Sequence, residues 1–312
     1  MMKLYPSWFL FFSIILVGTT LIVCGENWFT LWLGFELSLM CFLPMFMGGS
    51  LIMEGLSKYF LVQVGGSSLF ALSSLLSYLP ASGFIFTMSM FMKLGVFPFH
   101  MWVPLVMSSV GWEGCLFISV VQKLAPLFVL CNYSHVGPLM LLSFGVLNVL
   151  VGGILGMNQS YMRSLMAYSS ISHTGWLMLA FLFSLPLFVS YMFVYFSLVT
   201  ILFTCFSKLK LNKIVSGDKG TKLMVPVMIM FLTISGMPPF PVFYLKVAVI
   251  LYMTSYFYYI PFLLVGSMAS IYFYLTVVVA TIPNFLSFAS SSFTAPFLTF
   301  MLSLSPIFMF VA

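Results

Sequence analysis

Long apolar runs alternate with short segments that carry charge, glycine, proline or asparagine along the 312 residues. Each run has about the 17 to 25 residues that an α-helix needs to cross the hydrocarbon core of a bilayer. The pattern predicts about eleven membrane-spanning helices. They cover residues 8–25, 27–48, 58–79, 83–108, 114–132, 136–157, 163–184, 187–207, 223–255, 259–282 and 292–311. The ninth run exceeds one straight span, so we expect that helix to be broken or strongly tilted.

The composition supports the same class of fold. Hydrophobic residues make up 62% of the chain and charged residues 5%, which leaves no polar surface for a soluble protein. We therefore predict an all-α, polytopic transmembrane helix bundle that forms a single integral-membrane domain over residues 1–312. The first run lacks a small-residue cleavage site and is read as a span instead of a signal peptide. The five cysteines show no C-x-x-C spacing, so neither a metal site nor haem attachment is expected.

The basic residues outside the middles of the runs indicate how the chain crosses the membrane. All of them fall at the N-terminus or after an even number of predicted spans: Lys3, Lys58, Arg163, Lys208, Lys210, Lys213, Lys219 and Lys222. By the positive-inside rule this side is the cytoplasm or the mitochondrial matrix, and the C-terminus lies on the opposite side. The polar loop at about 208–222 is predicted on the same side. The net charge of +6 thus belongs to loops near lipid headgroups, and no nucleic-acid patch is expected.

Four ionisable residues lie near the middle of apolar runs: Glu36, Lys93, Lys123 and Lys246. A lysine at the centre of a membrane helix costs about 2.5 to 3.5 kcal/mol on insertion scales, so such residues usually serve a function. The alternative is that the lysines only pair with buried carbonyl groups. Burial favours the neutral forms of glutamate and lysine, whereas proximity favours both charged forms. A glutamate and a lysine that approach and separate would therefore exchange protons, which is the chemistry of a proton relay.

Two of the runs contain residues that interrupt helices. The fourth has MKLGVFPFHMWVP, in which Lys93 precedes Gly95 and Pro98, and the ninth has SGMPPFPVFYLK. In the latter, Lys246 follows Gly236, Pro238 and Pro239. Proline removes an amide donor and opens backbone carbonyl groups, which at membrane depth need protein or water partners. Paired interrupted helices indicate an inverted-repeat transporter architecture, although no clear residue-level repeat between the halves is evident from the sequence.

Further polar residues form a second group of candidates. His100 and His173 have side chains that titrate near neutral pH, so each either passes protons or is a packed, hydrogen-bonded histidine. Lys58 either feeds the buried charges or anchors its helix, and we favour anchoring. Tyr168 and the adjacent serines, Ser169 and Ser170, either hold water beside His173 or satisfy helix carbonyl groups, and we favour the second interpretation. His135 is expected in a loop.

Several motifs occur in an order that identifies a family. They are WLGFELSLMCFLP, KYFLVQ, MKLGVFPFHMWVP, QKLAPL, NQSYMRSLMAYSSISHTGW and GMPPFPVFYLK, between Trp32 and Lys246. The chain resembles the chain 2 family of mitochondrial NADH-ubiquinone oxidoreductase, the antiporter-like membrane subunits of respiratory complex I, in its shortened animal form. It departs from the family pattern at Pro241 and Val242, where Thr-Gly is common, and at Leu105, where an acidic residue is common.

This resemblance implies a function for the buried charges. The family uses a glutamate and a line of buried lysines to translocate protons, which carries over to Glu36, Lys93, Lys123 and Lys246. It implies no cofactor on this chain, because NADH, FMN, Fe-S clusters and ubiquinone are handled by partner subunits. The expected partners are other membrane-arm subunits, with antiporter-like chain 4 and small chains as neighbours, and membrane lipids such as cardiolipin. The expected location is the mitochondrial inner membrane, with the N-terminus in the matrix and the C-terminus in the intermembrane space.

Three hypotheses follow from these observations. In the first, the chain is a proton-translocating core subunit of complex I, and the oxidation of NADH and reduction of ubiquinone in other subunits drive it. The second is a stand-alone cation/proton antiporter of the same superfamily. In the third, the chain is a structural membrane subunit whose buried charges hold helices together.

Overall fold

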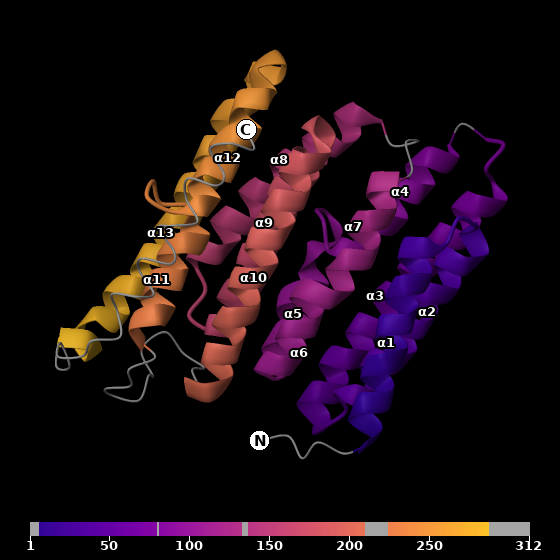
Figure 1. Cartoon of the computed structure of the whole chain (residues 1–312), viewed down its shortest axis with the longest axis horizontal. Helices are drawn as coiled ribbons and strands as arrows, with labels where there is room; N and C mark the ends of the chain where they lie inside the picture. Colours follow the sequence, from indigo (N-terminus) through magenta and orange to yellow (C-terminus); the bar gives the residue numbers. More distant parts are fainter. Residues whose placement is uncertain (1–5, 80, 133–136, 210–223, 287–312) are drawn as a thin grey trace. The chain divides into compact units, whose positions relative to one another are not determined.

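The computed structural model describes residues 6–79, 81–132, 137–209 and 224–286. Helices and short turns make up these residues, without a β-strand among them, which confirms the all-α prediction (Figure 1). The chain divides into two compact units, Met1–Met140 and Leu141–Ala312. We describe each unit by itself.

The first unit contains two unbroken helices, α2 and α3, that carry part of the site, and two helical segments with irregular turns. Its elements are α1 (Pro6–Cys24), α2 (Trp28–Met45), α3 (Ser50–Leu75), α4 (Ser82–Leu94), η1 (Phe99–Met101), α5 (Trp102–Ser109), α6 (Trp112–Leu116), the π-helical turn η2 (Phe117–Val121) and α7 (Gln122–Asn132). Helix α3 packs against α2, α4 and α5, and α7 packs against α4 and α1. Helix α3 therefore lies beside both helices on which Glu36 and Lys93 are found.

The second unit is built around a buried helix. Its elements are α8 (Pro138–Met157), whose first turn adjoins the unit boundary, α9 (Met162–Phe183), α10 (Leu185–Leu209), α11 (Met224–Ser235), α12 (Pro241–Tyr252), η3 (Met253–Tyr259) and α13 (Ile260–Leu286). Every residue of α9 from Ser164 to Ala180 is buried. Helices α10, α12 and α13 pack against it. The polar residues of α9 are therefore shielded from lipid and water.

The helices agree with most of the predicted spans. Six helical segments among the described residues are long and apolar enough to cross a membrane: Trp28–Met45, Ser82–Ser109, Trp112–Asn132, Pro138–Met157, Leu185–Leu209 and Pro241–Ala280. Helix α3 begins at Ser50, earlier than the predicted span that starts at residue 58. The extra turns carry an i,i+4 pair, Glu54 and Lys58, which stabilises a helix start that hydropathy does not reveal. The predicted span 292–311 and most of the loop at 208–222 lie outside the described residues.

Both helix interruptions occur where the sequence places them. Helix α4 ends at Gly95, which has a φ of 70°, and α11 ends at Gly236, which has a φ of 82°. Such left-handed backbone favours glycine, because a Cβ atom is strained there. Chain direction then changes through similar turns, in which Phe99 N donates to Val96 O at 2.8 Å and Phe240 N donates to Met237 O at 3.0 Å. The ninth run is thus broken, as one of the two alternatives predicts.

The two interruptions share a short sequence pattern, although the two halves of the chain show no longer repeat. Residues 95–99 read GVFPF and residues 236–240 read GMPPF, so that Gly, Pro and Phe recur at the same spacing. Pro241, a departure from the family pattern, occupies the first turn of α12. Proline fits that position because its fixed φ is helical and its missing N–H would have no helical partner. The departure is therefore compatible with the broken helix.

Candidate functional site

Glu36 lies in the middle of α2, where it is part-buried. Its carboxylate accepts a hydrogen bond of 2.5 Å from the hydroxyl of Ser67 on α3. Ser67 is 2% exposed. A hydroxyl group both donates and accepts hydrogen bonds, so Ser67 can hold the carboxylate and also exchange a proton with it. Ser67 was not among the residues predicted from the sequence.

Lys93 is buried in the last turn of α4, with 4% of its surface exposed. Its Nζ lies 4.4 Å from the centre of the Phe35 ring and 3.5 Å from the backbone oxygen of Gln63. Gly66 on α3 leaves room for the stem, because a Cβ atom there would lie 2.9 Å from Lys93 Cγ. The ammonium therefore has a cation–π contact and one long hydrogen bond as its partners, which compensate only partly for the loss of water.

Side chains also satisfy the carbonyl groups that the interruption of α4 exposes. Gln63 Nε2 donates to Lys93 O at 3.2 Å, and Trp102 Nε1 donates to Met92 O at 3.1 Å. The last carbonyl groups of a helix have no partner within the helix, so these contacts stabilise the interrupted end. Gln63 thus links α3 both to the backbone of Lys93 and, through its own carbonyl, to the Lys93 ammonium.

Glu36 and Lys93 do not form a direct ion pair. Within the described residues, the carboxylate oxygens of Glu36 and Nζ of Lys93 stay beyond the 4.0 Å of a salt bridge. Each is instead held by α3, through Ser67 and Gln63 respectively. The two side chains are therefore linked through α3 and not by a direct ion pair.

Lys123 is the second residue of α7 and is 2% exposed. The π-helical turn η2 immediately precedes this helix. π-Turns often occur at functional positions, because the extra residue changes which way the following side chains face. Helix α7 packs against α4, so Lys123 and Lys93 lie on neighbouring helices of the first unit.

Lys246 lies within α12 in the second unit and is 5% exposed. Its Nζ donates a 2.9 Å hydrogen bond to Ser235 O, the final residue of α11. Nζ also lies 5.8 Å from the ring of Trp176 on α9. The lysine thus caps the interrupted helix α11 with its charge near the negative end of the helix dipole.

His173 is 2% exposed and lies one turn before Trp176 on α9. Its Nδ1 is 3.0 Å from the hydroxyl of Tyr191, and its ring stacks on Tyr195 with 4.5 Å between ring centres. Residues three apart share a helix face, which places His173 near the side of α9 that meets Lys246. Both tyrosines come from α10 and were not predicted as site residues.

The other secondary candidates differ in their surroundings. His100 is 6% exposed in η1 and stacks on Phe97. Lys58 is 44% exposed and pairs with Glu54, which is compatible with an anchor. Tyr168 is buried on α9.

The remaining polar candidates and the cysteines add no separate site. Ser169 and Ser170 donate to carbonyl groups of their own helix, as our favoured interpretation predicts. His135 lies outside the described residues. Within the part of the chain that the structure describes, no group of three or more His, Cys, Asp or Glu side chains could hold a metal ion.

Comparison with known proteins supports the architecture and the sequence motifs. Residues 77–273 match the family described as NADH:quinone oxidoreductase/Mrp antiporter, TM. NADH-ubiquinone oxidoreductase chain 2 of Lumbricus terrestris is 35% identical, over 97% of this chain and 98% of the relative. A chain of respiratory complex I from Thermus thermophilus with bound aureothin has a TM-score of 0.84 and 20% identity, over 96% of this chain and 78% of that one.

A second solved structure has a similar fold. A chain of the membrane-bound sulfane sulfur reductase, an archaeal respiratory membrane complex, has a TM-score of 0.84 and 16% identity, over 99% of this chain and 76% of that one. The identity to both structures is low, so they establish the fold alone. Sequence identity and coverage identify the family: the chain belongs to the NADH-ubiquinone oxidoreductase chain 2 family, within the NADH:quinone oxidoreductase/Mrp antiporter membrane proteins.

Proposed function

We propose that this chain is a core membrane subunit of respiratory complex I that translocates protons through Glu36, Lys93, Lys123 and Lys246. The observation that carries the proposal is the burial of three lysine side chains in an apolar helical protein, at exposures of 4%, 2% and 5%. Maintaining such charges costs several kcal/mol each, so a purely structural role is disfavoured. A carboxylate can bind a proton and an ammonium group can release one, and both return to their first state without any cofactor.

The geometry of the first unit supports a proton exchange that depends on movement. Glu36 is held by Ser67 and Lys93 by Phe35 and Gln63, all on α2 or α3. A shift of α4 towards Glu36 would bring the ammonium to the carboxylate and stabilise both charges, and withdrawal would favour transfer of the proton. Lys93 lies two residues before Gly95, at the interrupted end of α4, so a change in that turn would move it.

The second unit provides a further proton-carrying group. Lys246 contacts the end of α11 at Ser235, so its position is linked to the turn at Gly236. His173, one turn before Trp176 on α9, and Tyr191 on α10 offer groups that donate and accept protons. In this proposal the oxidation of NADH and the reduction of ubiquinone take place in partner subunits, and their coupling to this chain is conformational.

The surroundings of the chain follow from the same proposal. It lies in the mitochondrial inner membrane, with the N-terminus in the matrix and the C-terminus in the intermembrane space, as the positions of the basic residues favour. Other membrane-arm subunits cover its outer helices, with antiporter-like chain 4 and small chains as neighbours. Anionic lipids such as cardiolipin would bind beside the basic residues of the matrix side.

Replacing Lys93 by methionine in the assembled complex tests the proton path. We expect Lys93→Met to reduce the protons translocated per NADH oxidised, while the complex still assembles, because methionine fills the same volume without a charge. Lys208→Met is the matched control, since Lys208 is exposed near the end of α10. The measurement is the number of protons translocated per NADH oxidised in sealed vesicles. Unchanged pumping in Lys93→Met would remove Lys93 from the mechanism.

The stand-alone antiporter is distinguished by the state of the native protein. Complex I membership predicts that the chain co-purifies and co-migrates with NADH-oxidising subunits in a mild detergent. An independent antiporter would migrate alone and exchange cations for protons in vesicles without NADH. The near full-length match to an NADH-ubiquinone oxidoreductase chain 2 favours the first outcome.

A further inference from the structure

Helix α3 carries a stripe of buried polar residues that leads towards Glu36. Tyr59, Gln63 and Ser67 are spaced four residues apart and are 0%, 6% and 2% exposed. Residues at this spacing lie on one face of a helix, one turn above another. Leu61, between them in sequence, is 69% exposed. The helix therefore turns polar groups to the protein interior and an apolar side chain outward, the arrangement typical of a polar path within a membrane protein.

One end of this α3 stripe, defined as Tyr59, Gln63 and Ser67, touches the proton-carrying groups. Ser67 donates to Glu36, and Gln63 exchanges contacts with Lys93 through its amide and its backbone oxygen. Two of the three residues of the stripe thus contact residues of the proposed proton path, namely Glu36 and Lys93.

Tyr59, at the opposite end of the stripe from Ser67, has a buried hydroxyl group without a hydrogen bond among the described residues. The ring packs between Phe42 and Trp102, with ring centres 4.8 and 5.7 Å away. Its hydroxyl oxygen is buried and makes no hydrogen bond within the described residues. A buried polar group without a hydrogen bond destabilises a protein, so such a hydroxyl normally binds water. Phenylalanine would fill the same space without this cost, which indicates that the hydroxyl is retained for a purpose.

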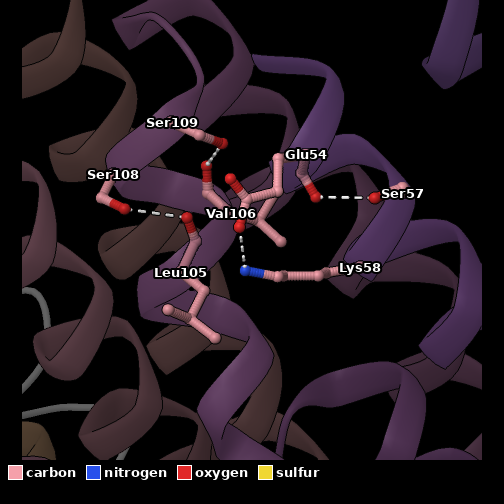
Figure 2. Close-up of polar contacts among 7 residues, drawn as sticks. All are labelled: Glu54, Ser57, Lys58, Leu105, Val106, Ser108 and Ser109. Atoms are coloured by element: carbon pink, nitrogen blue, oxygen red, sulfur yellow. Dashed lines mark hydrogen bonds and ion pairs between the residues drawn. The ribbon is translucent and has the colours of Figure 1, made fainter. Parts of the chain in front are cut away.

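Beyond Tyr59, towards its first turn, α3 becomes exposed. Figure 2 shows Glu54 and Lys58 there, joined at 2.6 Å, beside the end of α5 with Ser108 and Ser109. Glu54 is 62% exposed and Lys58 is 44% exposed. The hydrogen bond from Lys58 lowers the pKa of Glu54, which keeps that carboxylate ionised near neutral pH. Glu54 precedes Tyr59 by five residues on α3, and an ionised, exposed carboxylate at this end of the helix can collect protons from the aqueous side.

We propose that the α3 stripe is a proton uptake route from the Glu54–Lys58 end of the helix to Glu36. This inference rests on the proposed function. The hydroxyl groups of Tyr59 and Ser67 belong to residues two helical turns apart, about 12 Å along the axis, so a short chain of water molecules that passes Gln63 would connect them. Each hydroxyl accepts one proton and releases its own, so the net result is one proton delivered to the Glu36 carboxylate. Gln63 orients water and holds Lys93 beside the route.

Removing single hydroxyl groups from the stripe tests the route in the assembled complex. We expect Ser67→Ala and Tyr59→Phe each to lower the protons translocated per NADH several-fold, and Ser67→Thr to restore the ratio because it keeps the hydroxyl. Ser73→Ala is the matched control. Ser73 is on the same helix, is also 2% exposed and bonds its own helix at Phe70 O. Assembly, measured on native gels, should be equal for all four variants.

The outcomes separate this inference from the proposed function. If Ser67→Ala and Tyr59→Phe pump like Ser73→Ala while Lys93→Met and Glu36→Gln do not pump, the uptake route is wrong and the proposed function stands. If Glu36→Gln pumps normally as well, both fail. Should Ser67→Ala not assemble, the comparison of Tyr59→Phe with Tyr274→Phe decides, since Tyr274 is also a fully buried tyrosine but lies on α13, outside the stripe. Equal numbers of protons translocated per NADH in Tyr59→Phe and Tyr274→Phe would contradict the proposed route.

Discussion

Lys93 shows how a charge is placed inside an apolar helical protein without a direct counter-ion. The Phe35 ring contributes about 0.5–2 kcal/mol through its quadrupole, and Gln63 O offers one acceptor at 3.5 Å. The stem lies against α3 at Gly66, where any side chain would intrude. The position of the ammonium is therefore set by close packing between α3 and α4 more than by attraction to a partner.

Enlarging Gly66 should disturb this packing. In Gly66→Ala the new methyl group would lie 2.9 Å from Lys93 Cγ and 3.3 Å from Ser89 O. We expect a loss of stability of about 1–3 kcal/mol from overpacking and a reduced proton-to-NADH ratio. In the control, Gly65→Ala, the methyl group meets only the mobile end of Met92. Thermal release of the subunit from the complex measures stability, and equal behaviour of the two variants would contradict the predicted role of Gly66.

The Glu54–Lys58 pair makes a defined contribution to pH dependence. Lys58 lowers the pKa of Glu54 through a hydrogen bond and its positive charge. A carboxylate whose pKa is lower in the folded state stabilises the fold above its unfolded pKa, and this contribution is lost as the pH falls through the folded value. The effect is small because both side chains are exposed. In Lys58→Met we expect the stability difference from the parent to vanish in acid, once the pH falls below the lowered pKa of Glu54 in the folded protein. A difference that persisted there would contradict the pairing.

At the scale of elements, the interrupted helices couple a backbone turn to a lysine in each unit. Gly236 has a φ of 82°, and a Cβ atom there would lie 3.1 Å from Nζ of Lys246. We expect Gly236→Ala to destabilise the chain by about 1–3 kcal/mol and to move Lys246 from Ser235 O. Gly111→Ala, where the added atom meets open space at a negative φ, should change stability by less than about 0.5 kcal/mol. If Gly236→Ala and Gly111→Ala unfolded at the same temperature, the left-handed turn at Gly236 would not be required for stability.

The interruptions were predictable because their causes are local. Gly95 and Gly236 provide left-handed backbone, and the prolines that follow remove helical hydrogen bonds, so a few adjacent residues decide the structure. The π-helical turn η2 was not predicted, because its sequence FISVV contains neither glycine nor proline. The early start of α3 was missed because the pattern of hydrophobic residues breaks at Lys58, although the helix continues through its pair with Glu54.

The contacts between helices were beyond the reach of sequence patterns. Ser67 and Glu36 are separated by 31 residues and Gln63 and Lys93 by 30, so only the packing of α3 against α2 and α4 brings them together. Glu36 and Lys93 could be identified from the sequence because burying a charge in a membrane helix costs several kcal/mol. Burying a serine or a glutamine costs less, so neither residue type alone indicates a site. Their spacing of four residues, with Gly66 between, is the signal that could have indicated a polar helix face.

At the scale of the whole molecule, the distribution of basic residues makes a prediction about the membrane. Asn158 follows six predicted spans and Ser77 lies at the end of the third, so their loops should face opposite compartments. Both side chains are exposed outside the long helices. We expect a membrane-impermeant maleimide to label Ser77→Cys in mitoplasts, from the intermembrane side. Asn158→Cys should be labelled only in inverted vesicles, from the matrix side.

Labelling of both cysteines from one side would mean that the span count between them is wrong, because three helical segments separate the two loops in sequence. Those segments are Ser82–Ser109, Trp112–Asn132 and Pro138–Met157. An odd number of crossings must reverse the side, so the experiment tests the segments as a set. The native cysteines have to be replaced first, at least Cys24, which is exposed. The same pair of variants decides whether the N-terminus lies in the matrix, since the number of spans before each loop fixes the side on which the chain starts.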